Sequence, residues 1–163
     1  MASSTLMQPQ QKQNVGMGQV GLSNGDMLLS AVLGSCVGLA LYHPRFKIGA
    51  LAHIVLPAAS SEGALPGKFA DTALPHLLAE LAGAGVPRAG IVAKIAGGAC
   101  MFGASGPLQI GENNIAAVTH LLAEENITLL AEDVGGNKGR RVTFDCKTGE
   151  LCVEIAGQPK KIL

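Results

Sequence analysis

Residues 32–57 read VLGSCVGLALYHPRFKIGALAHIVLP, and this stretch decides the fold. It holds two apolar runs, residues 36–43 and 48–57, on either side of a short polar segment. Pro44 in that segment fixes φ and favours a turn, and each run has the composition of a strand. The stretch therefore predicts a β-hairpin.

A cysteine and a histidine occupy the two runs of this hairpin. In an extended strand, Gly34, Cys36 and Gly38 face the same side, so the thiol stands between two positions without side chains. His53 lies among aliphatic residues, where a buried imidazole needs a hydrogen-bond partner or loses its charge. If the runs pair, thiol and imidazole come within reach, as nucleophilic catalysis requires. A buried structural cysteine and a satisfied core histidine remain the alternatives.

The rest of the chain alternates strand-like runs with two helical patterns. Apolar stripes at helical spacing predict helices over residues 71–85 and 111–126, with Asp71 as a candidate cap of the first. Strand-like runs are expected at residues 15–23, 27–34, 89–99 and 127–133 and in a C-terminal hairpin over 140–157. Runs of strands around two helices indicate an α+β fold, layered, with mixed sheets. Residues 1–14 show no apolar period, so we expect a disordered tail before a single domain at 15–163.

Composition narrows the classes of partner and compartment. Of 163 residues, 48% are hydrophobic and 15% are charged, which is typical of a compact globule. Twelve basic and twelve acidic side chains cancel, so we expect neither nucleic acid nor an anionic membrane surface as a partner. No apolar run approaches the about 20 residues that span a bilayer, and the N-terminus lacks the features of a secretory signal. We therefore expect no membrane insertion and a cytoplasmic protein.

The remaining cysteines and histidines give no second site. The four cysteines are scattered, no C-x-x-C pair occurs, and the histidines lack zinc-ligand spacing, so we expect reduced thiols, no metal and no cofactor. His43, His76 and His120 are expected at the surface. The glycine-rich segment 96–106 lacks a nucleotide-binding motif and is interpreted as the wall of a cleft. Residues 132–141 carry three basic side chains, which indicate an exposed turn or a site for an acidic partner.

Six stretches, taken in order, resemble one protein family. They are LGSCVGLALY, KIGALAHIVLP, GKFADTAL, AKIAGGACMF, IGENN and LAEDVGGNKGR, and the resemblance extends from about residue 15 to about residue 156. The chain is similar to the chemoreceptor glutamine deamidases of bacterial chemotaxis, known as CheD. That family is similar in turn to the catalytic domain of glutamine-deamidating bacterial toxins, which implies an α/β/β layered sandwich.

The resemblance assigns roles to three residues. It implies that Cys36 is the nucleophile and His53 the base that activates it. The family has a threonine six residues before the cysteine, and here that position is Ser30. Serine keeps a hydroxyl that can orient the imidazole but lacks the methyl group that stiffens χ1.

The resemblance also implies a reaction and partners. The reaction is conversion of glutamine side chains on methyl-accepting chemoreceptors to glutamate, through a thioester on Cys36 and with release of ammonia. A glutamyl methyl ester forms the same thioester, so a methylesterase activity stays open. Family members bind a CheC-type phosphatase, so a regulatory binding module with little catalysis is the alternative of a different class.

Overall fold

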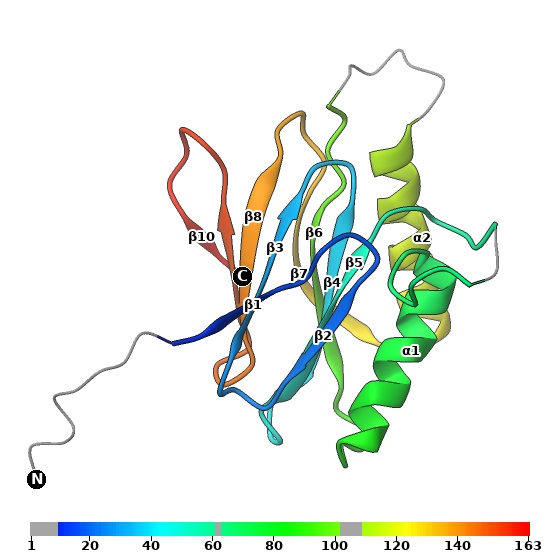
Figure 1. Ribbon diagram of the computed structural model, residues 1–163, viewed down its shortest axis with the longest axis vertical. Helices are drawn as coiled ribbons and strands as arrows, with labels where there is room; N and C mark the ends of the chain where they lie inside the picture. The colour runs from blue at the N-terminus through cyan, green and yellow to red at the C-terminus, as the bar shows by residue number, and fades with distance from the viewer. Residues whose placement is uncertain (1–9, 61–62, 102–108) are drawn as a thin grey trace, which may run out of the picture.

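The computed structural model describes residues 10–60, 63–101 and 109–163 (Figure 1). Two helices and ten strands follow one another in the described residues. In chain order they are β1 (Lys12–Asn14), β2 (Val20–Ser23), β3 (Leu28–Leu33), β4 (Val37–His43), β5 (Ile48–Ile54), α1 (Ala70–Gly83), β6 (Val92–Gly97), α2 (Ile110–Glu124), β7 (Thr128–Val134), β8 (Arg140–Asp145), β9 (Glu150–Glu154) and β10 (Lys161–Ile162). Both helices and the C-terminal hairpin lie where the sequence predicted them.

The strands form two sheets. The sheet we call outer has the order β1-β3-β8-β9-β10, and the central sheet has the order β2-β5-β4-β6-β7. Each contains one parallel pair, β1 with β3 and β6 with β7, among antiparallel ones. Figure 1 shows the outer sheet on one face of the central sheet and both helices on the other. The predicted α+β class with mixed sheets in an α/β/β order is confirmed.

The hairpin of β4 and β5 is the centre of the molecule. The predicted hairpin is confirmed, and its register runs from Val37 opposite Ile54 to His43 opposite Ile48. Side chains on one face pack under the helices, and those on the other face pack against the outer sheet. Both faces are therefore buried, which explains why β4 is apolar at almost every position. Each aliphatic side chain buried here stabilises the fold by about 1.5–3 kcal/mol.

The N-terminal segment differs from the prediction. Residues 12–14 form β1, which pairs in parallel with Leu28–Ser30 of β3, and Val15 behind it is buried. The side chains of β1 are exposed and polar, so they give no strand pattern, and backbone pairing alone orders them. The predicted tail is therefore wrong for residues 12–14, and residues 1–9 lie outside the described residues.

The start of α1 also differs in detail. Phe69 is the N-cap residue, and no side chain caps the helix. Asp71 lies inside the first turn, where its carboxylate accepts hydrogen bonds from the Ala59 N–H. Asp71 therefore ties the preceding loop to the helix and does not cap it.

One of the three histidines expected at the surface is buried. His43 is 4% exposed, its Nε2 donates to the Ala89 carbonyl oxygen (2.9 Å), and its Nδ1 accepts from the Arg45 N–H (3.2 Å). His76 and His120 have partly or fully exposed side chains, as predicted. His43 is thus a satisfied structural histidine.

Candidate active site

Cys36 and His53 lie on the same face of the central sheet. Cys36 ends the turn between β3 and β4, and His53 stands directly opposite Gly38 in β5. Cys36 lies one residue beyond the last ladder pair, Val37 with Ile54, and so next to the end of the ladder that contains His53. Cys36 packs in the cluster between the two sheets, and alternation along β5 directs His53 to the same side as Leu51 of that cluster; the two residues are 8% and 4% exposed. The register of this hairpin therefore places the backbone of Cys36 near the end of the strand that carries His53.

The imidazole of His53 is oriented by a backbone carbonyl group. Its Nδ1 lies 2.8 Å from the carbonyl oxygen of Val15. A carbonyl only accepts, so Nδ1 carries the proton and Nε2 carries the lone pair. Nε2 is buried and has no hydrogen-bond partner in the described part of the chain. A buried, unpaired acceptor costs stability and is typical of a group reserved for another role.

The segment around residues 15–19 fixes the position of this histidine. The Gly18 N–H donates to the His53 carbonyl oxygen (2.9 Å), and the His53 N–H donates to the Gln19 carbonyl oxygen (3.1 Å). The Val15 N–H donates to the carbonyl oxygen of Ser30 (2.7 Å). Sequence reasoning missed Val15, because a main-chain carbonyl leaves no mark on the residue type.

Ser30 is linked to His53 through the backbone and not through its hydroxyl group. Its β3 neighbours Leu29 and Ala31 pack into the layer between the sheets, where His53 also lies. Side chains alternate along a strand, so the Ser30 side chain points to the opposite face of the outer sheet. Among the described residues, no hydrogen bond joins its hydroxyl to His53. The oxygen that the structure places at the imidazole is the Val15 carbonyl, and a contact of the Ser30 hydroxyl with His53 stays a prediction of the resemblance.

Burial raises the pKa of the Cys36 thiol above its ordinary value. A thiol of this kind is protonated at neutral pH, and a protonated thiol is a poor nucleophile. A protonated thiol needs a base before it can act as a nucleophile. The unpaired Nε2 of His53 lies on this face of the sheet, and in the described residues no hydrogen bond joins it to the Cys36 thiol.

Two glycines interrupt the ladder beside Cys36. The Gly98 N–H donates to the Cys36 carbonyl oxygen (2.8 Å), but the reciprocal bond from the Cys36 N–H is not formed among the described residues. Gly97 and Gly98 have φ values of 106° and 68°, in the region that favours glycine, and a Cβ on Gly111 would lie 2.5 Å from the Gly98 carbonyl oxygen. The Gly98 carbonyl is thus turned toward α2. The Cys36 N–H keeps its hydrogen-bonding capacity for another acceptor.

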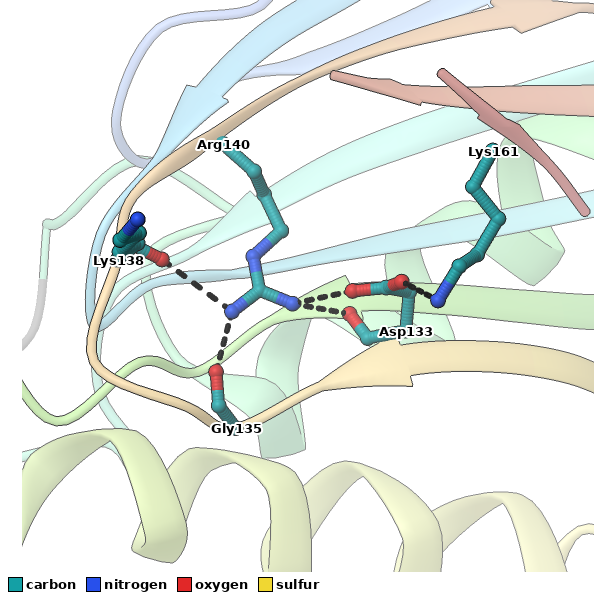
Figure 2. A network of polar contacts seen from close by, with 5 residues as sticks. All are labelled: Asp133, Gly135, Lys138, Arg140 and Lys161. Atoms are coloured by element: carbon teal, nitrogen blue, oxygen red, sulfur yellow. Dashed lines mark hydrogen bonds and ion pairs between the residues drawn. The ribbon is translucent and has the colours of Figure 1, made fainter. Parts of the chain in front are cut away.

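A buried ion pair closes the same end of the molecule, and Figure 2 shows it. Arg140 donates to the carboxylate and the carbonyl group of Asp133 and to the carbonyl groups of Gly135 and Lys138. Lys161 lies 2.7 Å from the other carboxylate oxygen. The side chains of Arg140 and Asp133 are 3% and 8% exposed. The prediction of an exposed basic turn is therefore wrong for Arg140, which joins β7 of the central sheet to β8 of the outer sheet.

This ion pair supports the backbone next to the cysteine. It holds the turn that contains Gly135, whose N–H donates to the Gly97 carbonyl oxygen (2.9 Å). The neighbouring Gly98 N–H in turn donates to Cys36. The ion pair of Arg140 and Asp133, which we call the clamp, and the candidate site are therefore joined by one continuous series of hydrogen bonds.

Acid should weaken this clamp. Burial alone raises the pKa of the Asp133 carboxyl, but the hydrogen bond from Lys161 and the charges of Arg140 and Lys161 outweigh it and lower that pKa. A lowered folded-state pKa contributes stability above the unfolded value of about 3.9, and this stability is lost as pH falls through the folded value. We expect the difference in unfolding free energy between the unsubstituted chain and Asp133→Asn to be constant near neutral pH and to narrow below about pH 4. Urea titrations across the acid range measure it, and a constant difference would contradict the assignment.

Two other thiols, Cys146 and Cys152, belong to the side of the outer sheet. Burial, with a smaller contribution from the charge of Asp145, raises the pKa of Cys146 to about 12. Cys146 and Cys152 carry free thiols on or beside the outer-sheet strands β8 and β9. Within residues 10–60, 63–101 and 109–163, no three His, Cys, Asp or Glu side chains are grouped closely enough to hold a metal ion. Residues 102–106 of the glycine-rich segment lie outside the described residues, so its interpretation as the wall of a cleft stays a prediction.

A thiol and an imidazole on one face of a sheet are residue types that nucleophilic catalysis uses. The family model described as CheD chemotactic sensory transduction matches residues 55–155. The chemoreceptor glutamine deamidase CheD of Thermotoga maritima is 41% identical over 147 residues, which cover 90% of this chain and 93% of that protein. The probable chemoreceptor glutamine deamidase CheD of Moorella thermoacetica is 46% identical over 143 residues, or 83% and 85% of the two chains. The chain belongs to the CheD family.

Neither helix in the described residues has the length and apolar character needed to cross a bilayer. The family match begins at residue 55, after Cys36 and His53, whereas the similarity to the relatives covers most of the chain. The geometry of the hairpin is therefore the main observation on these two residues.

Proposed function

We propose that this protein is a chemoreceptor glutamine deamidase in which Cys36 is the nucleophile and His53 the general base. One observation carries the proposal: His53 presents a buried, unpaired Nε2 on the face and in the register where Cys36 lies. Relatives that cover most of the chain are named for the same reaction, which gives the substrate class. Such receptors present their glutamines in the cytoplasm, so the proposal includes that compartment.

The first half of the reaction forms a thioester. His53 Nε2 takes the thiol proton as Cys36 Sγ attacks the side-chain amide carbon of the glutamine. The carbonyl oxygen becomes an oxyanion, and the uncommitted Cys36 N–H is the donor closest in the chain to receive it. The imidazolium then protonates the nitrogen, the C–N bond breaks, and ammonia leaves.

The second half regenerates the thiol. His53 Nε2 takes a proton from water, the resulting hydroxide attacks the thioester carbon, and the C–S bond breaks. The thiolate recovers a proton from the imidazolium, and the glutamine has become glutamate. The Val15 carbonyl stabilises the imidazolium at both stages, because its oxygen accepts from Nδ1.

A cavity of about 340 Å³ near the end of β5 offers a place for the polypeptide around the glutamine, although neither Cys36 nor His53 lines it. It is lined by Met17, Gly18, Val55, Leu65 and Lys68, among others, and the Gly18 N–H bonds the carbonyl of His53. Met17 and Leu65 are 67% and 53% exposed. Exposed apolar side chains around this cavity fit a protein substrate whose apolar residues flank the target.

The family resemblance adds two predictions about activity to this proposal. A glutamyl methyl ester would give the same thioester with methanol as the leaving group. Binding to a CheC-type phosphatase would be a second activity of the same fold. The Cys36→Ala variant distinguishes hydrolysis from phosphatase binding. It should lose both the deamidase and the methylesterase reactions and should still bind the phosphatase.

The function is tested with chemoreceptor cytoplasmic fragments. Incubation with the protein should release ammonia and give the mass increase of amide-to-acid conversion at particular glutamine residues. Fragments incubated in buffer alone are the control for spontaneous deamidation. Unchanged fragment masses, with a folded protein at stoichiometric concentration, would contradict the proposal.

Ser30→Ala distinguishes the structural assignment from the one expected by resemblance. The Ser30 hydroxyl points away from His53, and the serine contributes its carbonyl oxygen to Val15, which alanine also supplies. We expect the kcat of Ser30→Ala to stay within about threefold of the unsubstituted value. Steady-state ammonia release measures it, and a loss as large as that of a His53 variant would show that the hydroxyl acts on the imidazole.

A further inference from the structure

Asn114 is a fully buried polar residue on α2 that sequence reasoning placed on no site. It is 0% exposed, and it shares the buried stripe of the helix with Gly111, Val118 and Leu122. The first turn of α2 lies against the segment that bonds Cys36, because a Cβ on Gly111 would meet the carbonyl oxygens of Gly98 and Ala99 at 2.5 Å. The helix therefore delivers the Asn114 side chain to the end of the β4–β5 hairpin.

The amide of Asn114 bridges the two strands that carry the thiol and the imidazole. Its Nδ2 donates to the Ser35 carbonyl oxygen (3.0 Å) and to the Val55 carbonyl oxygen (2.9 Å). Ser35 precedes Cys36, and Val55 follows His53 by two residues. Both hydrogens of the amide are used, and a flipped amide would put its oxygen against two carbonyl oxygens, so the orientation is fixed.

This bridge stands where the strand ladder ends. The last ladder pair is Val37 with Ile54, and beyond it the two chains separate. The Asn114 amide joins them one step further, on the side of Cys36. Its Oδ1 is buried without a hydrogen-bond partner among the described residues, which lowers the stability of the fold. An apolar side chain would pack here without that loss of stability.

We propose that Asn114 is a positioning residue that holds Cys36 and His53 in register for proton transfer. The proposal rests on the proposed function, because it assigns the pair a reaction. It predicts that loss of the amide donors moves the thiol relative to Nε2 while the hairpin and its core survive. A displacement of about 1 Å at a reacting group lowers a rate by about a hundredfold.

The test compares Asn114→Asp, Asn114→Ser and Val118→Ala. Asp has the shape of Asn but no donors when ionised, and Ser can donate to only one of the two carbonyls. Val118, one turn further along α2, is 1% exposed and packs in the core beneath the helices, so Val118→Ala lowers stability without touching the site. Thermal unfolding ranks the three variants by stability.

Two readouts separate positioning from stability. We expect the rate of Cys36 alkylation by iodoacetamide at pH 7, followed on the Cys36 peptide by mass spectrometry, to fall by about tenfold or more in Asn114→Asp and by less in Asn114→Ser. In Val118→Ala it should be unchanged. On receptor fragments, kcat should fall in the same order with little change in KM.

Alkylation needs no substrate, so the two proposals fail differently. Wild-type alkylation rates in both Asn114 variants, alongside active unsubstituted protein, would overturn the role of Asn114. If alkylation is slow in the Asn114 variants but the unsubstituted protein leaves every receptor fragment unchanged, the positioning role of Asn114 is supported. The proposed chemoreceptor substrate is then contradicted. Equal loss in Val118→Ala and Asn114→Asp would show that stability alone governs the site and would also overturn it.

Discussion

Cys36→Ala is expected to abolish deamidation, with no ammonia release above that of buffer. The reaction proposed here passes through a thioester on this sulfur, and alanine leaves no nucleophile in its place. The fold should survive, because the substitution removes one atom at a strand end that keeps its backbone bond to Gly98. Circular dichroism and thermal unfolding check the fold, and ammonia release checks the activity.

Cys152→Ala is the matched control for this variant. Cys152 is a free, partly buried thiol on β9 of the outer sheet, away from the hairpin that carries His53. Activity should persist in Cys152→Ala and be lost in Cys36→Ala. Turnover by the Cys36→Ala protein at the unsubstituted rate would remove the thioester mechanism.

His53→Gln is expected to lower kcat by about 10²–10⁴-fold, the usual contribution of a positioned general base. Glutamine is close in size and polar, so the site stays filled, but its amide takes no proton at neutral pH. KM should change little, since the imidazole acts on the thiol and not on the bound polypeptide. Steady-state kinetics on receptor fragments separates kcat from KM.

The chain offers a control histidine for this prediction. His43 is buried to the same 4% exposure, lies in the same hairpin and has both ring nitrogens engaged, by Ala89 and Arg45. His43→Gln should lower stability and leave kcat nearly unchanged. Equal effects of the two substitutions on kcat would mean that His53 is a structural histidine as well.

Much of the fold was predictable from apolar period and turn chemistry. Two apolar runs on either side of Pro44 predicted the hairpin of β4 and β5, and the structure confirms that the two runs pair. The two helices carry clear apolar stripes. These features depend on local pattern, which a sequence displays directly.

The parts that were missed depend on backbone groups or on distant pairing. The oxygen that orients His53 belongs to the main chain of Val15, and β1 is held by backbone bonds under polar side chains. Arg140 looked exposed because its partner Asp133 is on a separate strand, and only the sheet-to-sheet contact buries both. Asn114 had one usable signal, since its spacing from Val118 places it in the buried stripe of α2.

For Ser30, the family resemblance predicts a position in the sequence but not the direction of the side chain. Its distance from Cys36 in the chain matches the family pattern, but side-chain direction is set by the alternation of β3. The side chains of Leu29 and Ala31 pack toward the central sheet, so alternation directs the side chain of Ser30 to the opposite face of β3. The backbone of Ser30 still serves the site, through its bond to Val15.

The central claim is that the His53 imidazole takes the proton of the Cys36 thiol, and the pH dependence of Cys36 alkylation tests it without any substrate. Because burial raises the pKa of this thiol, an unassisted Cys36 would react slowly at neutral pH. We predict a rate at pH 7 at least about tenfold higher in the unsubstituted protein than in His53→Gln, with the two rates converging as rising pH deprotonates the thiol directly. Equal rates at neutral pH would contradict the account.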